Sequence, residues 1–204
     1  MMNGAILILS GPSGAGKSTI IESAKSSIGD FYFSVSTTTR VPRDGEVDGV
    51  DYHFVDKNSF EEGIRAGEFL EYAQVHDNYY GTSLKPVKNA LRAGKLVIFD
   101  IDVQGHKLAR KRLGRFITSV FITPPSLDEL KRRLESRATD KPETVKKRLQ
   151  NAKKEIESIK DYDFLIINDS IKRATEEFIA VAKSARLKSS LYNLDNFISD
   201  WLRV

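Results

Sequence analysis

The chain has 204 residues, which is enough for one domain with a sizeable core. Its formal net charge is +4, and its 32 basic residues are mixed with 28 acidic ones along the whole sequence. Such a charge suits anionic substrates, but it is too small and too dispersed to indicate a nucleic-acid partner. Disulfides and thiolate chemistry are excluded because the chain has no cysteine.

No apolar run approaches the roughly 20 residues of a membrane span. The first apolar run, residues 5–9, has no Lys or Arg before it and leads directly into a glycine-rich loop. We therefore do not interpret it as a signal peptide, and we expect a cytoplasmic protein with no membrane partner.

The glycine-rich loop at residues 11–18 reads GPSGAGKS and fits the phosphate-binding loop pattern. Its glycines allow a sharp turn in which successive backbone N–H groups point at one anion. Lys17 can place a positive charge beside the terminal phosphates of ATP, and the hydroxyl of Ser18 can bind Mg²⁺. The predicted ATP-binding residues here are Gly11, Pro12, Ser13, Gly14, Ala15, Gly16, Lys17, Ser18 and Thr19.

Four runs are apolar almost throughout: residues 5–9, 96–101, 117–122 and 164–167. Continuous hydrophobicity is typical of central parallel strands that are covered by helices on both faces. Helical patterns separate the runs. The sequence therefore predicts an α/β fold, a three-layer sandwich of the phosphate-loop NTPase class with a doubly wound, parallel central sheet.

Residues 31 to about 85 interrupt this rhythm. They are rich in Thr, Tyr, Phe, Gly and Asp, and contain short strand-like pieces at 31–35, 52–55 and 69–75. We interpret this stretch as a small, mostly β insertion in a single domain that spans residues 1–204. The predicted core comprises residues 1–33, 86–126 and 161–204, the insertion 34–85, and a helical lid region 127–160.

Two arginines of the insertion, Arg40 and Arg43, flank Pro42, which stiffens the turn between them. A fixed pair of guanidinium groups suits a phosphomonoester. The hydroxyls of Tyr52 and Tyr80 can also donate to phosphate oxygens. Glu71 lies among apolar residues, so it is either an exposed alternate position of a strand or a buried hydrogen-bond acceptor; the pattern favours exposure.

The lid region carries two helical stripes separated by a polar tip. Pro142 is well placed as the first residue of the second helix. The pattern alone leaves two interpretations open, a mobile lid or a helical hairpin on the surface.

The segment from residue 171 to 202 is also helical in pattern and has a continuous apolar face. We expect this face to pack on the sheet; the alternative is a surface for self-association. Whether the protein is a monomer or a homo-oligomer is left undecided.

Several motifs together resemble the guanylate kinase family, over residues 4 to about 170. The matching segments are SVSTTTR at 34–40, PRDGE at 42–46, DY at 51–52, EYA at 71–73, YYGT at 79–82 and DIDVQG at 100–105. They occur in the family's order, so the resemblance is more specific than the phosphate loop alone.

The resemblance implies a role for each matching residue. The GMP phosphate would be held by Arg40, Arg43, Tyr52 and Tyr80, and guanine would be read by Ser36, Glu71, Thr82 and Asp102. Lys17 and the lid arginines Arg133, Arg137 and Arg148 would stabilise the transferring phosphoryl group. Asn168 would lie near the adenine of ATP, and Ser18 would bind Mg²⁺ directly while Asp100 acts on the ion through water.

The implied activity is Mg²⁺-dependent transfer of the γ-phosphoryl group of ATP to GMP, and to dGMP, in purine nucleotide metabolism. The alternative is a non-catalytic guanylate-kinase-like domain that binds phosphorylated protein partners. One residue departs from the family pattern: Ala138 stands where a glycine is common after the second lid arginine. With Pro142 nearby, this change predicts that the lid hinges elsewhere or closes more slowly.

Overall fold

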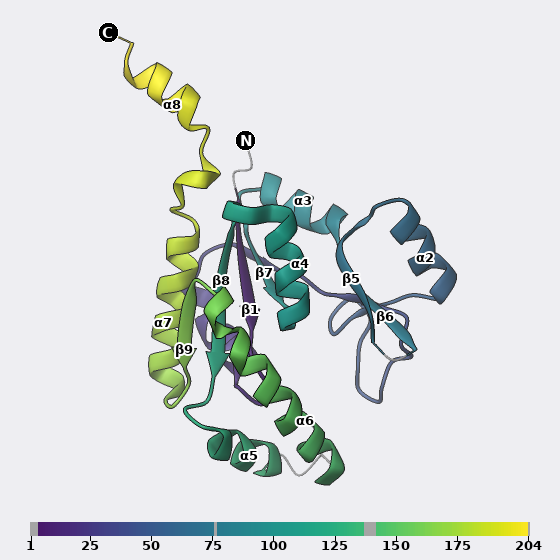
Figure 1. Ribbon diagram of the computed structural model, residues 1–204. Coiled ribbons are helices and arrows are strands. Elements are labelled where there is room, and N and C mark those ends of the chain that lie inside the picture. The colour runs from purple at the N-terminus through teal and green to yellow at the C-terminus, as the bar shows by residue number, and fades with distance from the viewer. Residues whose placement is uncertain (1–3, 76, 137–141, 204) are drawn as a thin grey trace.

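The computed structural model describes residues 4–75, 77–136 and 142–203. Its centre is a five-stranded sheet in which every neighbouring pair of strands is parallel (Figure 1). In spatial order the strands are β2 (Phe31–Phe33), β7 (Leu96–Asp100), β1 (Ala5–Ser10), β8 (Ile117–Thr123) and β9 (Phe164–Ile167). The predicted α/β architecture with a parallel central sheet is confirmed.

Helices cover both faces of this sheet, which explains the continuous apolar runs. On β1, Leu7 and Leu9 pack toward α1 (Lys17–Ala24) and α7 (Ile171–Ala185). Ile6 and Ile8 point the other way, toward α3 (Leu84–Arg92) and α4 (Val103–Leu113). Short 3₁₀ helices follow α1 at Lys25–Ser27 and α4 at Gly114–Phe116. No helix within the described ranges is long and apolar enough to cross a membrane.

The insertion forms a second, four-stranded sheet beside the core (Figure 1). Its order is β4 (His53–Phe54), β3 (Thr37–Thr38), β6 (Asn78–Ser83) and β5 (Phe69–Val75). The helix α2 (Lys57–Arg65) begins at Asp56, whose carboxylate accepts a hydrogen bond from the backbone N–H of Ser59. The ring of Phe60 is buried and stacks on that of Phe69, with centroids 4.3 Å apart.

The strand-like piece at residues 31–35 belongs to the central sheet. The predicted boundary at residue 33 left Phe31–Phe33 in the core, and this strand pairs in parallel with Leu96–Ile98 at the edge of the central sheet. The backbone N–H of Ser34 extends this pairing by donating to the carbonyl of Ile98. A three-residue aromatic strand does not reveal its partner, because the pairing spans more than sixty residues of chain.

The lid region contains α5 (Leu127–Ser136) and α6 (Pro142–Glu155), and Pro142 opens the second helix as predicted. Leu130 and Leu134 of α5 pack against Val145 and Ala152 of α6, so the two helices share a small core of their own. A 3₁₀ helix at Ile156–Asp161 returns the chain to β9. The residues between α5 and α6, among them Arg137 and Ala138, lie outside the described ranges.

The last segment divides into a packed part and an exposed part. Helix α7 buries Ala174, Phe178 and Ala182 against the sheet, as expected. After a 3₁₀ turn at Ser189–Leu191, however, α8 (Leu194–Trp201) projects away from the core (Figure 1), and none of its residues is buried. The expectation that this apolar face packs on the sheet is therefore wrong for residues 194–202.

Candidate active site

The phosphate loop lies where β1 ends, with the first turn of α1 directly behind it. Gly11 has φ 147°, and a Cβ atom there would stand 1.9 Å from the carbonyl oxygen of Ile122. Gly16 has φ 91°, and a Cβ atom there would stand 2.4 Å from the side-chain nitrogen of Asn168. The loop therefore requires glycine at both positions, and it presents the N-terminus of α1 to an anion.

Lys17 is folded back over the loop to which it belongs. Its ammonium group donates to the carbonyl of Gly11 over 2.8 Å and lies 3.7 Å from a carboxylate oxygen of Asp100, at the end of β7. Burial raises the pKa of Asp100, and the charge of Lys17 opposes that rise. Lys17 thus sits between a carbonyl and a carboxylate at the place where phosphates would enter.

Asn168 holds the phosphate loop in place through hydrogen bonds. Its side-chain amide donates to the carbonyl of Ala15 over 2.8 Å, and its backbone N–H donates to the carbonyl of Thr123 over 2.8 Å. The residue is only 4% exposed. Its contact with adenine stays a prediction, since the structure engages the side chain with the phosphate loop.

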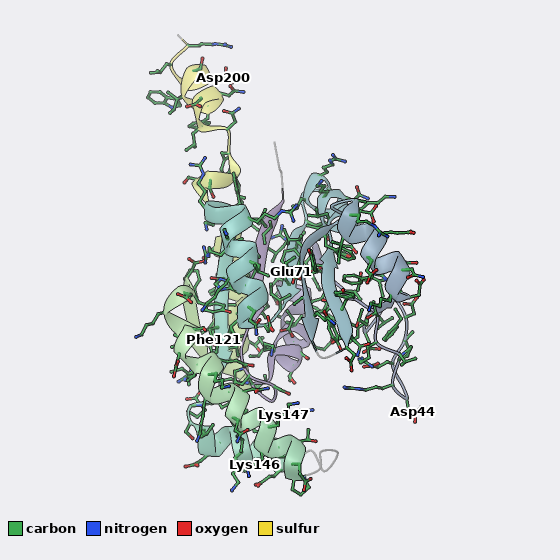
Figure 2. The ribbon with its side chains drawn as sticks, turned by 45° about the vertical axis from the view of Figure 1, so that its right-hand side comes forward. Asp44, Glu71, Phe121, Lys146, Lys147 and Asp200 are labelled. Carbon is green, nitrogen blue, oxygen red and sulfur yellow. The ribbon has the colours of Figure 1, made fainter. Side chains whose placement is uncertain are left out.

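Two of the three predicted lid arginines reach the loop and its support. Arg148 donates to the hydroxyl of Ser13 over 2.9 Å. Arg133 donates to the backbone carbonyl of Asn168 and to the carboxylate of Glu129, each over 2.7 Å. Arg137 lies outside the described residues. Four neighbouring basic residues were expected on a solvated face, and all are exposed: Lys131, Arg132, Lys146 and Lys147. Figure 2 labels the last two on α6.

Glu129 is a residue that the sequence did not single out. Its carboxylate receives hydrogen bonds from both Arg132 and Arg133, and these hydrogen bonds lower its pKa to about 2. It therefore stays ionised and orients Arg133 toward β9.

A second cationic cluster occupies the insertion. One nitrogen of Arg40 lies 2.7 Å and 2.8 Å from the two carboxylate oxygens of Glu46. Its guanidinium carbon is 5.4 Å from the ring centre of Tyr52, which meets Tyr80 edge-on at 6.0 Å. Arg43 is exposed, and its backbone N–H donates to Glu46. Glu46 thus orders this turn, a role that could not be predicted from its place in the sequence motif.

Glu71 and Thr82 meet across β5 and β6. The hydroxyl of Thr82 donates to a carboxylate oxygen of Glu71 over 2.7 Å. Burial raises the pKa of Glu71, and the nearby charge of Asp102 adds to the rise. Of the two alternatives for Glu71, the structure supports the partly buried acceptor over the exposed position. Figure 2 shows Glu71 on the side of the insertion that faces α4.

Asp102 links this pair to the core. It is the N-cap of α4, where it accepts from the backbone N–H of Gly105 over 2.7 Å. Its charge raises the pKa of Glu71 on one side and contributes to raising that of Glu155, at the end of α6, on the other. Burial is the main cause at Glu155, and Lys17 opposes it. Glu155, also missed from sequence, is therefore near enough to Asp102 and Lys17 for both charges to affect its pKa.

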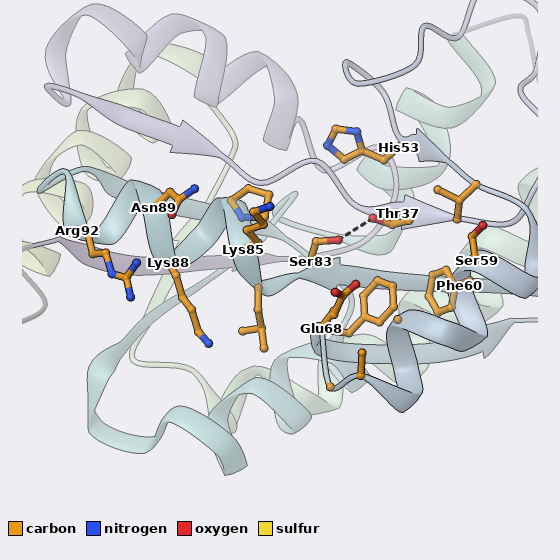
Figure 3. A pocket seen from close by; sticks show the side chains of 17 residues that line it. Thr37, His53, Ser59, Phe60, Glu68, Ser83, Lys85, Lys88, Asn89 and Arg92 are labelled. Atoms are coloured by element: carbon orange, nitrogen blue, oxygen red, sulfur yellow. Dashed lines mark hydrogen bonds between the residues drawn. The ribbon is translucent and has the colours of Figure 1, made fainter.

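A pocket of about 740 Å³ lies elsewhere, between α2 and α3 (Figure 3). The hydroxyls of Thr37 and Ser83 meet in it at 3.0 Å. Because side chains alternate along a strand, Thr82 points to the opposite side of β6 from Ser83. The pocket is thus behind the Glu71–Thr82 pair. Ser36, the remaining predicted guanine reader, is half-buried just before β3, and its backbone carbonyl accepts from the N–H of His53.

The residues near the loop fit a magnesium ion that is held mainly by nucleotide phosphates. Ser18 is exposed on the first turn of α1, and the carboxylate of Asp100 has Lys17 as its ion-pair partner. Within the described ranges, no three His, Asp or Glu side chains gather as a metal site. Mg²⁺ commonly binds through one or two protein oxygens together with water and substrate phosphates, so this donor set suffices.

The fold and the site define a phosphate-loop NTPase with a second cationic cluster in the insertion. Comparison with known proteins identifies the branch of this class. The guanylate kinase family profile matches residues 3–184, so the chain belongs to the guanylate kinase family.

Similar proteins span nearly the whole chain. A guanylate kinase of Sulfurimonas denitrificans is 54% identical over 97% of this chain and 96% of its own. A guanylate kinase of Campylobacter jejuni strain RM1221 is 48% identical over 98% of both chains. The crystal structure of guanylate kinase from Anaplasma phagocytophilum superposes with a TM-score of 0.72 at 32% identity, over 91% of this chain and 88% of that one.

Proposed function

We propose that this chain is an ATP:GMP phosphotransferase that converts ATP and GMP to ADP and GDP with Mg²⁺, and that it also accepts dGMP. The family and its full-length relatives support the activity. The observation that carries the site is the hydrogen-bonded Glu71–Thr82 pair in the insertion, which lies close enough to Asp102 of the core for that charge to raise the pKa of Glu71.

The insertion is proposed as the GMP site. Guanine presents N1–H and N2–H₂ as donors, which the carboxylate of Glu71 can accept together, while hydroxyls and N–H groups of Ser36 and Thr82 serve the other edge. Asp102 lies beside Glu71 and offers a further acceptor. Adenine lacks the N1–H and would leave a partly buried carboxylate unpaired, which gives large discrimination.

The phosphate of GMP is assigned to the second cluster, Arg40, Arg43, Tyr52 and Tyr80. Arg40 is bound to Glu46. A phosphate that enters between the rings would compete for, or share, that guanidinium group, and Arg43 is free to turn inward from the exposed side of the loop. Two guanidinium groups and two phenol hydroxyls match the charge and the acceptor atoms of a phosphomonoester.

The loop, Lys17 and the lid arginines are assigned to the donor side. Phosphoryl transfer needs in-line positioning and positive charge around the transferring group rather than covalent chemistry. Arg148 bonded to Ser13 and Arg133 beside β9 border the loop, and Arg137 is proposed to join them. Asn168 is proposed to support ATP binding by holding Ala15.

No protein base is needed, because a phosphomonoester is largely dianionic at neutral pH, with its second pKa at about 6. Magnesium, when bound through Ser18 and indirectly through Asp100, supplies charge neutralisation for the donor phosphates. Residues 34–85 and 127–160 are proposed as the parts that close over GMP and ATP. None of the comparisons favours the non-catalytic alternative.

A coupled assay of ADP release tests this proposal. ATP is supplied with GMP, dGMP, AMP, UMP or dTMP in turn, and turnover is expected with GMP and dGMP only. Lys17→Ala is expected to lower kcat by roughly 100- to 1000-fold with unchanged circular dichroism. Lys25→Ala, on the same helical segment but exposed, is the matched control and should be active. Equal turnover of AMP and GMP would refute the guanine site, and an active Lys17→Ala enzyme would refute the phosphate-loop assignment.

A further inference from the structure

Strand β5 contains a β-bulge beside Glu71. The pairing of β5 with β6 shifts by one residue between Phe69 and Tyr72, so two residues of β5, Leu70 and Glu71, stand opposite the single residue Thr82 of β6. An unbroken register from Phe69 onward would place Leu70 opposite Thr82, and the bulge brings Glu71 there instead. The hydrogen bond between Thr82 and Glu71 therefore depends on this extra residue.

The bulge lies where β5 passes from the core of the insertion to the core of the central sheet. Before it, the ring of Phe69 stacks on that of Phe60 within the insertion. After it, Leu70 is 4% exposed and packs in the cluster that contains Ala109 and Leu113 of α4. The bulge is thus a point at which the insertion is attached to α4.

Arg112, in the last turn of α4, binds the backbone of this bulge. One terminal nitrogen of its guanidinium group donates to the carbonyl of Phe69 over 2.7 Å and to the carbonyl of Leu70 over 2.8 Å. Successive carbonyls of a regular strand point to opposite edges, so a single nitrogen reaches both only where the strand is distorted. Arg112 therefore binds a backbone shape that the bulge creates.

We propose that Arg112 is a positioning residue for guanine recognition, which holds the bulge of β5 so that the carboxylate of Glu71 faces the N1–H and N2–H₂ groups of guanine. The inference rests on the proposed function, in which Glu71 reads guanine. Because Arg112 bonds to backbone carbonyls, its effect on the base is transmitted through the placement of Glu71.

The placement of Glu71 matters because hydrogen bonds weaken steeply as their angles depart from linearity. One carboxylate oxygen of Glu71 already accepts from Thr82 over 2.7 Å. The two guanine donors must be met by the same carboxylate, so a small turn of the strand improves one hydrogen bond at the expense of another. Release of the bulge should therefore weaken recognition of the base while leaving the phosphate cluster around Arg40 unaffected.

The basic residues that precede Arg112 on α4 supply matched controls. Arg110 donates to the hydroxyl of Ser119 and to the carboxylate of Asp163, both in the core. Lys111 is exposed. Replacing Arg110 tests the loss of a bond that supports only the fold, and replacing Lys111 tests the loss of a surface charge.

The experiment compares GMP with inosine monophosphate (IMP), which is GMP without the 2-amino group. In the full-length chain, the ratio of kcat/KM for GMP to that for IMP measures how well that amino group is accepted. Arg112→Met removes the donors and keeps an apolar stem. It should raise the KM for GMP about tenfold and lower the GMP/IMP ratio by a similar factor, with kcat for GMP and the KM for ATP unchanged.

The controls separate positioning from stability. Arg110→Met should unfold at a lower urea concentration and Lys111→Met at the concentration of the parent chain, and both should keep the parent GMP/IMP ratio. Arg112→Lys is a milder change that provides a second folded variant. Its ammonium group lacks the fixed fork of a guanidinium group, so it should lower the ratio about threefold.

A double-mutant cycle tests whether Arg112 acts through Glu71. In a Glu71→Gln background, the carboxylate that Arg112 positions is already absent. Arg112→Met should then raise the KM for GMP by less than about twofold further. A tenfold rise in both backgrounds would mean that Arg112 acts on GMP by another route, and the proposal would be wrong.

Two further results would overturn the proposal. One is a parent-like GMP/IMP ratio in the folded Arg112 variants, because Arg112 would then support only the fold. The other is a parent chain that uses GMP and IMP equally well, which would refute guanine reading by Glu71 itself. The second result requires no Arg112 variant, so a failure of the proposed function is distinguished from a failure of the positioning role.

Discussion

The side-chain amide of Asn168 donates a hydrogen bond to the carbonyl oxygen of Ala15 over 2.8 Å and so ties the end of β9 to the middle of the phosphate loop. The same residue accepts from Arg133 of the lid through its backbone carbonyl. Loop and lid therefore share one buried support. A phosphate loop that is already ordered without nucleotide loses little conformational entropy when a nucleotide binds. The contact of Asn168 with Ala15 therefore prepares the loop for phosphate.

Replacing Asn168 by Ala removes the donor and leaves the carbonyl of Ala15 buried without its partner. Such a loss costs about 1–3 kcal/mol. We expect the free energy of unfolding to fall by that amount and the KM for ATP to rise more than the KM for GMP. Urea denaturation and two-substrate kinetics measure both effects. Asn58→Ala, on the exposed face of α2, is the control, and equal effects of the two variants would contradict the bracing role.

Glu71→Gln is expected to have opposite effects on binding and on stability. Glutamine cannot accept both guanine donors, so the KM for GMP should rise about 100-fold, as loss of hydrogen bonds to a charged group does. The KM for ATP should stay unchanged. Because burial raises the pKa of Glu71, its ionised form is disfavoured in the folded state at neutral pH, so the variant should unfold at a urea concentration at least as high as the parent chain.

The sign of the pH dependence follows from the same pKa. As the pH falls through the raised pKa of Glu71, the carboxylate is protonated and can no longer accept from guanine. The KM for GMP of the parent chain should therefore rise at acid pH, and that of Glu71→Gln should rise less, since only protonation of the GMP phosphate, whose second pKa is about 6, remains to weaken its binding. Glu62→Gln, an exposed control on α2, should behave as the parent chain does. A parent profile that is flat in acid would remove Glu71 from guanine recognition.

The sequence pattern predicted correctly those parts of the fold that depend on interactions between neighbouring residues. The loop at Gly11–Ser18, the four apolar strands and the start of α6 at Pro142 each depend on a few adjacent residues, and all are found. The last strand, Phe164–Ile167, is an edge strand in which only Ile166 is buried, so its apolar run did not indicate a central position. The edge position of Phe31–Phe33 could not be predicted, because its only signal is a pairing with a distant strand.

The candidate site shows the same division. Motif residues such as Arg40 and Glu71 could be named from the sequence, but the residues that hold them in place could not. Glu46, Glu129 and Glu155 are ordinary acids in a chain with 28 of them. Only the folded structure shows that the first two bind Arg40 and Arg133, and that the charges of Lys17 and Asp102 act on Glu155. The exposure of α8 could not be predicted either, because an apolar stripe does not indicate what packs against it.

Arg148→Ala tests the assignment of the lid to catalysis. If Arg148 stabilises the transferring phosphoryl group, kcat should fall roughly 100- to 1000-fold while the KM for GMP changes little. Lys147→Ala, one residue away and exposed, should be nearly as active as the parent chain. Steady-state kinetics with both substrates distinguishes the two. A variant that raises the KM for ATP and keeps kcat would make Arg148 a binding residue instead.

His106→Phe tests the prediction that no histidine acts in the reaction and that this one limits acid stability. His106 is 1% exposed, its ring stacks on Tyr162 at 4.0 Å, and neither ring nitrogen has a hydrogen-bond partner among the described residues. Burial, with help from Arg110, lowers its pKa to about 4. Phenylalanine keeps the ring stack and removes two unpaired buried nitrogens, so the variant should be no less stable at pH 7 and should keep its activity.

The difference in the free energy of unfolding between His106→Phe and the parent chain should depend on pH. The folded pKa of His106 is below its unfolded value, so the unfolded chain binds a proton first as the pH falls, and the folded state loses stability between about pH 6.5 and pH 4. The loss amounts to at most roughly 3 kcal/mol. Urea denaturation of both proteins at each pH isolates this contribution, because all other groups are common to them. Below pH 6.5, the free energy of unfolding of His106→Phe should exceed that of the parent chain by a growing amount. A difference that does not change with pH would mean that His106 is already charged in the folded state or titrates normally.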